Sequence, residues 1–206
     1  MSTTKYETIP SDAIIEKTAA ALTANGMTTH IVANGIAAKQ MALSLIPKGA
    51  EVMDMTSVTL DTIGVSKIIQ ESGDYISARK VSYALDLKTQ QKEIHNLRSI
   101  PVWTIGSVHA VTEEGSVMVA SQSGSQLAAY SFGSDHVIWV VGAQKIVANR
   151  DEGFKRIYEH CLVLESERAH KAYGVPASSV NKLFILDKEI VAGRITVILV
   201  KEKLGF

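Results

Sequence analysis

The sequence predicts a layered α/β domain with a mostly parallel sheet and right-handed crossovers. Apolar runs typical of strands alternate with stretches of helical periodicity along the 206 residues, and this alternation is typical of parallel strands connected by helices. The run His136–Gly142 is apolar from its second residue to its last, which indicates a strand buried on both faces of the sheet. We therefore expect this strand to be central.

The first 73 residues contain two strand–turn–helix units behind an N-terminal helix. Ser11 is placed to cap that helix, and Ile15 and Leu22 lie on its apolar stripe. The N-terminal helix is expected to pack on the α/β core. The predicted order is a helix at about 11–25, a strand at 29–33, a helix at 36–46, a strand at 51–55, and a helix through 63–69 that ends at Gly73.

The remaining residues continue the alternation. The polar segment 75–98 indicates a pair of helices, and segments 103–111 and 117–120 predict a hairpin-like pair of strands. Asn149 stands three residues before Glu152, which is the spacing of a capping box and opens a further helix. The other predicted elements are an Ala-rich helix that ends at Tyr130, a helix at 169–173 that ends at Gly174, and strands at 184–186 and 195–200 that complete the sheet.

Length and composition limit the function classes. The chain fits one domain spanning 1–206. Lys and Arg (21) balance Asp and Glu (21), so no long-range positive field attracts nucleic acid or an anionic membrane. The single cysteine, Cys161, cannot form an internal disulfide or hold an iron–sulfur cluster alone. The first ten residues contain no apolar signal region, and no apolar run approaches the ~20 residues of a membrane helix. We expect a cytoplasmic protein.

Polar loops follow several predicted strands, where an α/β sheet presents helix N-termini to ligands. Thr56, Ser57 and Thr59 carry hydroxyls that could surround a phosphate or carboxylate, although Ser57 or Thr59 could equally cap the next helix. The loop with Ser123 and Gly124 offers the same two interpretations. Neither loop matches the Lys-containing phosphate loop or the dinucleotide-binding glycine pattern.

Two charged positions are candidates for chemistry. Glu113 lies with Glu114 before Gly115 at a strand-connecting turn, and a desolvated carboxylate there could act as a base or nucleophile. Lys145 follows the buried strand and could reach an anionic ligand. The alternatives are solvated turn residues and a surface lysine. No metal site is expected, because the six histidines lack metal-binding spacing, and Cys161 is interpreted as a buried, inert thiol.

Three separated segments resemble the lactate-utilization (LUD) domain family. The most specific is 140–147 (VVGAQKIV), followed by 164–169 (LESERA) and 172–174 (AYG). Segments 57–60, 63–64 and the C-terminal stretch 194–206 are also similar to this family. The family lies in a superfamily with ribose-5-phosphate isomerase, glucosamine-6-phosphate deaminase and CoA transferases. The resemblance therefore implies a Rossmann-like, three-layer α/β fold.

Two shorter likenesses connect the candidate residues to that superfamily. Segment 56–59 (TSVT) resembles the phosphate loop of the pentose-phosphate isomerases, although the hydroxyl of Thr59 falls one position early. Segment 113–115 (EEG) resembles the Glu-Asn-Gly motif that carries the nucleophilic glutamate of CoA transferases. The Gly-rich Arg-Glu segment of the isomerases is replaced by 123–126 (SGSQ), so isomerase activity does not transfer directly.

The resemblance implies a role in the oxidation of lactate to pyruvate, with iron–sulfur clusters carried by partner proteins. The first hypothesis is a protein without its own cofactor that binds a small anionic metabolite, with Glu113 as the acid/base or nucleophile if it is an enzyme. The alternatives are a non-catalytic interaction subunit of an oxidoreductase and a free-standing isomerase or transferase, and a homo-oligomer is left open. The candidate substrate-binding residues are Thr56, Ser57, Thr59, Gly115, Ser123, Gly124, Gln144 and Lys145.

Overall fold

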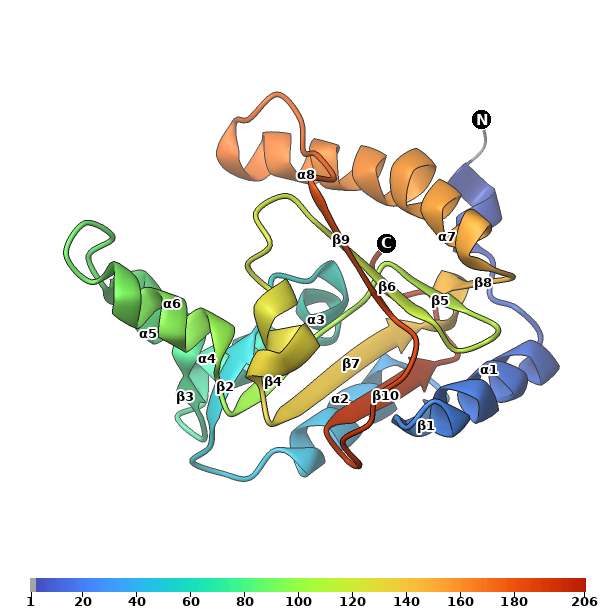
Figure 1. The fold of residues 1–206 in the computed structure, drawn as a ribbon, viewed down its shortest axis with the longest axis horizontal. Coiled ribbons are helices and arrows are strands. Elements are labelled where there is room, and N and C mark those ends of the chain that lie inside the picture. Colours follow the sequence, from blue (N-terminus) through green and yellow to red (C-terminus); the bar gives the residue numbers. More distant parts are fainter. Residues whose placement is uncertain (1–2) are drawn as a thin grey trace.

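Six parallel strands form the main sheet of the computed structural model, which describes residues 3–206 (Figure 1). Strand β7 is paired with β10 on one side and β4 on the other, and it is buried from Val137 onward. The predicted central strand is therefore confirmed. In spatial order the strands are β1 (Thr28–Val32), β10 (Ile195–Val200), β7 (His136–Gly142), β4 (Trp103–Gly106), β2 (Glu51–Asp54) and β3 (Ile76–Ser77).

Both faces of the main sheet are covered, as the apolar run in β7 requires. Ile138 and Val140 belong to one hydrophobic core, whereas Val137, Trp139 and Val141 belong to the other, because successive side chains of a strand point to opposite faces. The first core lies beneath helices α2 (Gly35–Leu45), α3 (Val58–Ile63) and α4 (Val65–Glu71). The second lies beneath helix α1 (Asp12–Ala24) and a smaller sheet. The predicted Rossmann-like three-layer arrangement is confirmed.

The smaller sheet was not predicted. Its strands are β8 (Ile146–Val147), β5 (Ala110–Thr112), β6 (Val117–Ser121) and β9 (Lys182–Leu186), in that order. The predicted strand 103–111 is therefore wrong, because the chain leaves the main sheet after Gly106 and enters the second sheet at Ala110. Segment 184–186 also joins this sheet rather than the main one. The predicted hairpin is confirmed by the antiparallel pairing of β5 with β6.

Two helical predictions need correction. The single helix through 63–69 is divided into α3 and α4 by Gly64, whose φ of 73° is left-handed and ends the first helix. The pair expected in 75–98 is confirmed as α5 (Ala78–Ala84) and α6 (Gln91–Ser99). The helices expected from Asn149 and at 169–173 are one continuous rod, because no Gly or Pro interrupts 154–173.

This rod crosses above the second sheet (orange in Figure 1). It consists of α7 (Arg150–Arg156), a π-helical turn (Ile157–Cys161) and α8 (Leu162–Tyr173). The Asn149 side chain accepts a hydrogen bond from the Glu152 N–H at 3.0 Å, as the predicted cap requires. Gly174, with φ of 69°, ends the rod. Within residues 3–206, no helix is both long and apolar enough to cross a membrane.

Candidate functional site

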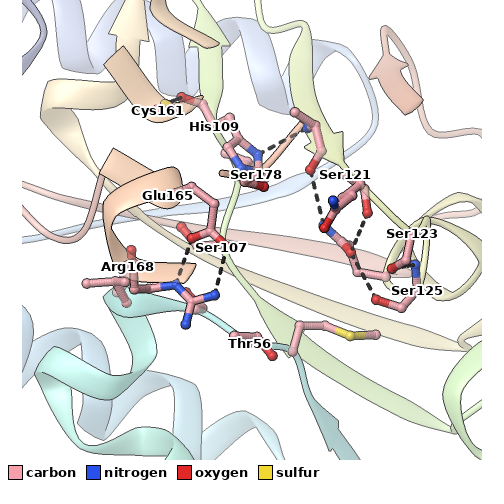
Figure 2. Close-up of a pocket in the computed structure, with 18 of the residues that line it drawn as sticks. Thr56, Ser107, His109, Ser121, Ser123, Ser125, Cys161, Glu165, Arg168 and Ser178 are labelled. Atoms are coloured by element: carbon pink, nitrogen blue, oxygen red, sulfur yellow. Dashed lines mark hydrogen bonds and ion pairs between the residues drawn. The ribbon is translucent and has the colours of Figure 1, made fainter. Parts of the chain in front are cut away.

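A cavity of about 280 Å³ lies at the carboxyl edge of the main sheet. Its floor is formed where β2, β4 and β7 end, and its walls come from the second sheet, the α5–α6 pair and α8. Figure 2 shows the Glu165–Arg168 pair and the loop with Ser121, Ser123 and Ser125 on opposite sides of this space. The volume is near the lower end of the range for small-molecule sites, and the position is the usual ligand-binding edge of parallel sheets.

Lys145 lies at the floor of the cavity. A short 3-10 turn (Ala143–Lys145) after β7 directs its side chain inward, so that only 2% of the residue is exposed. Its ammonium donates to Thr59 Oγ1 (3.1 Å), Ser107 Oγ (3.0 Å) and the Val108 carbonyl (3.1 Å). Burial, reinforced by the positive charge of Arg156, lowers the pKa of Lys145 to about 7. The alternative interpretation as a surface lysine is therefore wrong.

His109 presents a neutral ring to the cavity. Its Nδ1 accepts a hydrogen bond from the Ala120 N–H at 3.1 Å, so the ring carries its proton on Nε2. Burial, with the charges of Lys145 and Arg156, lowers the pKa of His109 to about 3. Nε2 has no hydrogen-bond partner among the residues that the structure describes. His109 can therefore donate one hydrogen bond to a ligand at neutral pH.

Cys161 also lines the cavity. Its Sγ accepts a hydrogen bond from Arg156 Nη1 at 2.8 Å, and Arg156 donates in addition to the His109 carbonyl. Burial raises the pKa of the Cys161 thiol, against the opposing effect of Arg156 and Lys145. The protonated, buried state agrees with the interpretation of Cys161 as an inert thiol.

The end of β2 carries an arginine-bound carboxylate. Asp54 is fully buried and accepts from Gln70 Nε2 at 2.6 Å, while Arg79 Nη1 lies 3.5 Å from its Oδ2. Burial raises the pKa of Asp54, although Gln70 and Arg79 oppose the change. Arg79 Nη2 also donates to Thr56 Oγ1 at 3.0 Å. The Thr56 hydroxyl is thereby placed beside a guanidinium, as an anion site requires.

The other hydroxyls of this loop serve the fold. Ser57 Oγ accepts from the Leu60 N–H at 3.4 Å and is the N-cap of α3, so the capping interpretation applies to it. Thr59 is buried and donates to the Leu204 carbonyl at 3.1 Å. Ser57 and Thr59 nevertheless line the cavity together with Thr56. The loop 56–59 therefore lies at the cavity as predicted, and Thr56 is the residue of this loop that contacts a positive charge, that of Arg79.

The rim of the cavity adds two arginines. Arg98 lies with its guanidinium carbon 5.0 Å from the Tyr83 ring centre and donates through Nε to Ser82 Oγ at 3.3 Å. Arg168 forms two bonds of 2.7 Å to the Glu165 carboxylate. Among the described lining residues, three side chains are arginines, Lys145 adds a positive charge when it is protonated, and two are carboxylates. The cavity therefore carries an excess of positive charge, which suits an anionic ligand.

The serine loop after β6 reaches the cavity as predicted. Ser121 Oγ accepts from the Gly124 N–H at 2.8 Å and donates to Gln126 Oε1 at 3.0 Å, which fixes the loop. Ser123 lines the cavity, whereas Gly124 provides a left-handed turn with φ of 89° behind it. This loop is therefore a wall of the cavity, and Gly124 shapes it rather than lining it.

In addition to Gly124, three predicted residues lie outside the cavity. Glu113 pairs with Lys17 Nζ at 2.9 Å, and Gly115 packs against the backbone of α1, where an added Cβ would lie 2.8 Å from Leu22 N. Strand β6 separates their turn from Ser121 by five residues, or roughly 15 Å at the rise of a strand. Gln144 instead donates to the Leu204 carbonyl at 3.0 Å and holds the C-terminal segment. The structure therefore brings together Lys145 and the two hydroxyl loops, but not Glu113.

Several lining residues were missed by the sequence reasoning. Asp54 had a detectable signal, because a charged residue follows the apolar pair Val52 and Met53 at the end of a predicted strand. Ser107 and His109 lie in a segment predicted to be continuous strand, and Arg79 and Arg98 lie in polar helices without a distinguishing pattern. Within the described part of the chain, no group of three or more His, Cys, Asp or Glu side chains could hold a metal ion.

Comparison with known proteins places the chain in a family. A family model described as LUD domain matches residues 15–200, and no curated protein matches at a significant level. The fold is similar to the crystal structure of a DUF162 family protein from Deinococcus radiodurans, with a TM-score of 0.55 and 16% identity over 93% of this chain and 99% of that chain. At this identity the similarity supports the fold alone. Because the family model covers most of the sequence, the chain belongs to the LUD domain family.

Proposed function

We propose that this protein binds a small anionic metabolite, a hydroxy acid, keto acid or phosphorylated compound, at the carboxyl edge of its main sheet. Family membership supports a role associated with lactate utilization. The observation that carries the proposal is the excess of cationic over carboxylate side chains around a partly open cavity. An anion that enters the cavity is attracted by this excess, and the hydroxyl-rich walls replace part of its hydration.

Arg98 and Arg79 are the groups that would contact the anion. The terminal nitrogens of Arg98 have no protein hydrogen-bond partner within residues 3–206, so they are available to a carboxylate or phosphate. Arg79 lies beside Thr56 at 3.0 Å, so one anionic group could accept from both side chains. Lys145 adds positive charge from the cavity floor when it is protonated, although its three N–H groups already have protein acceptors.

Oxidation of lactate to pyruvate removes two electrons and two protons, and these need an acceptor. The donor set here does not fit an iron–sulfur cluster, because the chain has a single cysteine and that thiol is buried against Arg156. We assign the electron acceptor to partner proteins that carry such clusters. The chain itself contributes the binding site for the acid.

The transferase alternative depended on Glu113 as a nucleophile. That carboxylate is paired with Lys17 at the turn of the β5–β6 hairpin, outside the cavity. A ligand bound beside Thr56 and Arg79 would therefore not meet it. The geometry favours binding of a small acid over acyl transfer to this glutamate.

Isothermal titration calorimetry with lactate, pyruvate, ribose 5-phosphate and acetyl-CoA tests the proposal. One of these anions should bind, and Arg98→Gln should weaken that binding about 10-fold or more, since a hydrogen bond to a charged group contributes about 1.5–3 kcal/mol. The matched control is Arg150→Gln, because Arg150 pairs with Asp187 outside the cavity. Absence of binding by all four compounds, or equal weakening by both variants, would contradict the proposal.

A further inference from the structure

We propose that Ser107 and Lys145 form a serine–lysine catalytic pair, with Ser107 as the nucleophile and Lys145 as its base, that cleaves a small ester or thioester. Ser107 follows β4 at the point where the chain leaves the main sheet, and Lys145 follows β7, the neighbouring strand. Their Oγ and Nζ atoms are 3.0 Å apart. This distance is within the range that joins a nucleophile to its activating base.

Both side chains are positioned for contact with a substrate. They line the same cavity, and Figure 2 includes Ser107 among its labelled lining residues. Ser107 is half-buried, so its hydroxyl is shielded from bulk water without being enclosed. It donates a hydrogen bond of 2.7 Å to the Val140 carbonyl, which fixes the side-chain orientation in the resting protein.

Lys145 has the surroundings of a general base rather than of a structural cation. Its three acceptors are two hydroxyls and one carbonyl, and no carboxylate pairs with it in the described chain. The charged or titratable groups near it are Arg156 from α7, Cys161 and His160 from the π turn, and His109 from the segment between the sheets; burial lowers the pKa of His160, which favours its neutral form. The positive charge of Arg156 lowers the pKa of Lys145, and Cys161 raises it. His109 is neutral and adds no charge. The pKa of about 7 leaves a large neutral fraction near neutral pH.

A neutral Lys145 changes the hydrogen bonding of Ser107. The amine then has a lone pair, and the Ser107 hydroxyl can rotate from the Val140 carbonyl to donate to it. His109 completes the arrangement, because its Nε2–H faces the cavity and can donate to the substrate carbonyl oxygen as negative charge develops there. The cavity thus combines a nucleophile, a base and a neutral hydrogen-bond donor.

The reaction balances without an oxidant. Ser107 Oγ attacks the acyl carbon and forms a C–O bond, while its proton passes to Lys145 Nζ. The bond from the acyl carbon to the leaving oxygen or sulfur then breaks, and the leaving group takes that proton from Lys145. Water attacks the resulting acyl-Ser107 ester with Lys145 as base, which releases the carboxylic acid and restores the Ser107 hydroxyl.

A neutral alkyl fluorophosphonate tests the pair directly, because it phosphorylates activated serines with loss of fluoride. Intact-protein and peptide mass spectrometry should locate one adduct on Ser107. Ser107→Ala should abolish the adduct, whereas Ser44→Ala should retain it, since the exposed Ser44 hydroxyl donates to the Met41 carbonyl outside the cavity. The labelling rate should rise about tenfold between about pH 6 and about pH 8, because the neutral fraction of a base with a pKa of about 7 rises by that factor.

Three results would overturn the proposal: no adduct on the folded protein, an adduct that persists in Ser107→Ala, or a labelling rate independent of pH. Lys145→Met should reduce labelling at least tenfold, and full labelling of that variant would exclude Lys145 as the base. If Lys145→Met does not fold, the pH profile of the unaltered protein still decides the question. The reagent carries no charge, so this experiment can fail while anion binding succeeds, and the reverse.

Discussion

Replacement of Lys145 by methionine should remove a pH-dependent penalty on stability. The pKa of this lysine is about 7 in the folded protein and 10.5 in an unfolded chain, so between these values unfolding takes up a proton. The free energy of unfolding therefore rises with pH across this window. The penalty is fully present below about pH 7 and absent above about pH 10.5.

The expected size follows from the two pKa values. At about 1.4 kcal/mol per pH unit, the interval from about 7 to 10.5 corresponds to about 5 kcal/mol. Methionine has a similar volume and no charge, so its packing cost is the same at every pH. The stability of the wild type minus that of Lys145→Met should therefore increase by about 5 kcal/mol between about pH 7 and about pH 10.5.

Urea unfolding followed by the fluorescence of Trp103 and Trp139 measures this difference at a series of pH values. Cys161 titrates in both proteins and largely cancels in the comparison. A difference that stays constant with pH would show that Lys145 keeps its ordinary pKa in the folded protein. That result would refute the argument from burial and would also remove the basis for a neutral lysine beside Ser107.

Two further variants test how the chain holds this architecture. Asn149→Ala should cost about 1 kcal/mol in urea unfolding, because the Glu152 N–H loses its cap, and Asn149→Ser should recover most of it. Gly106→Ala should destabilise by about 3 kcal/mol or more, because the added Cβ would lie 1.8 Å from the Tyr130 hydroxyl oxygen. In Gly49→Ala the added Cβ meets no atom within 4 Å, so this variant should lose only about 1 kcal/mol of stability, the cost of a left-handed φ for alanine. Equal losses of stability in the two glycine variants would contradict the steric argument.

The main sheet could be predicted because its signals are local. The continuous apolar run of β7 and the strand–turn–helix units before Gly73 follow from periodicity and turn residues. The second sheet could not be predicted in this way. The two short apolar segments in 110–121 specify strands but not the partners with which they pair.

The site was predictable only in part, for the same reason. The hydroxyls of 56–59 follow a main-sheet strand and so reach the edge where ligands bind, as expected. Whether Lys145 is buried depends on Thr59 and Ser107, which are 86 and 38 residues away in the sequence. Glu113 has the composition of a catalytic turn, but the length of β6 places it at the wrong end of the hairpin. Contacts of this range have no signature in a single sequence.

The π turn at Ile157–Cys161 determines which face of helix α8 points toward the cavity. A π turn contains one residue more than the α-helical turn it replaces, and each residue of an α-helix turns the chain by about 100°. If the same residues wound as a continuous α-helix, α8 would be rotated by about that angle about its own axis, whereas deletion of Glu159 would restore α-helical winding and keep α8 in its present orientation. In the rotated helix Glu165 and Arg168 would point away from the cavity while α7 kept its contacts with the second sheet, so the π turn allows α7 and α8 to pack on their separate partners at the same time.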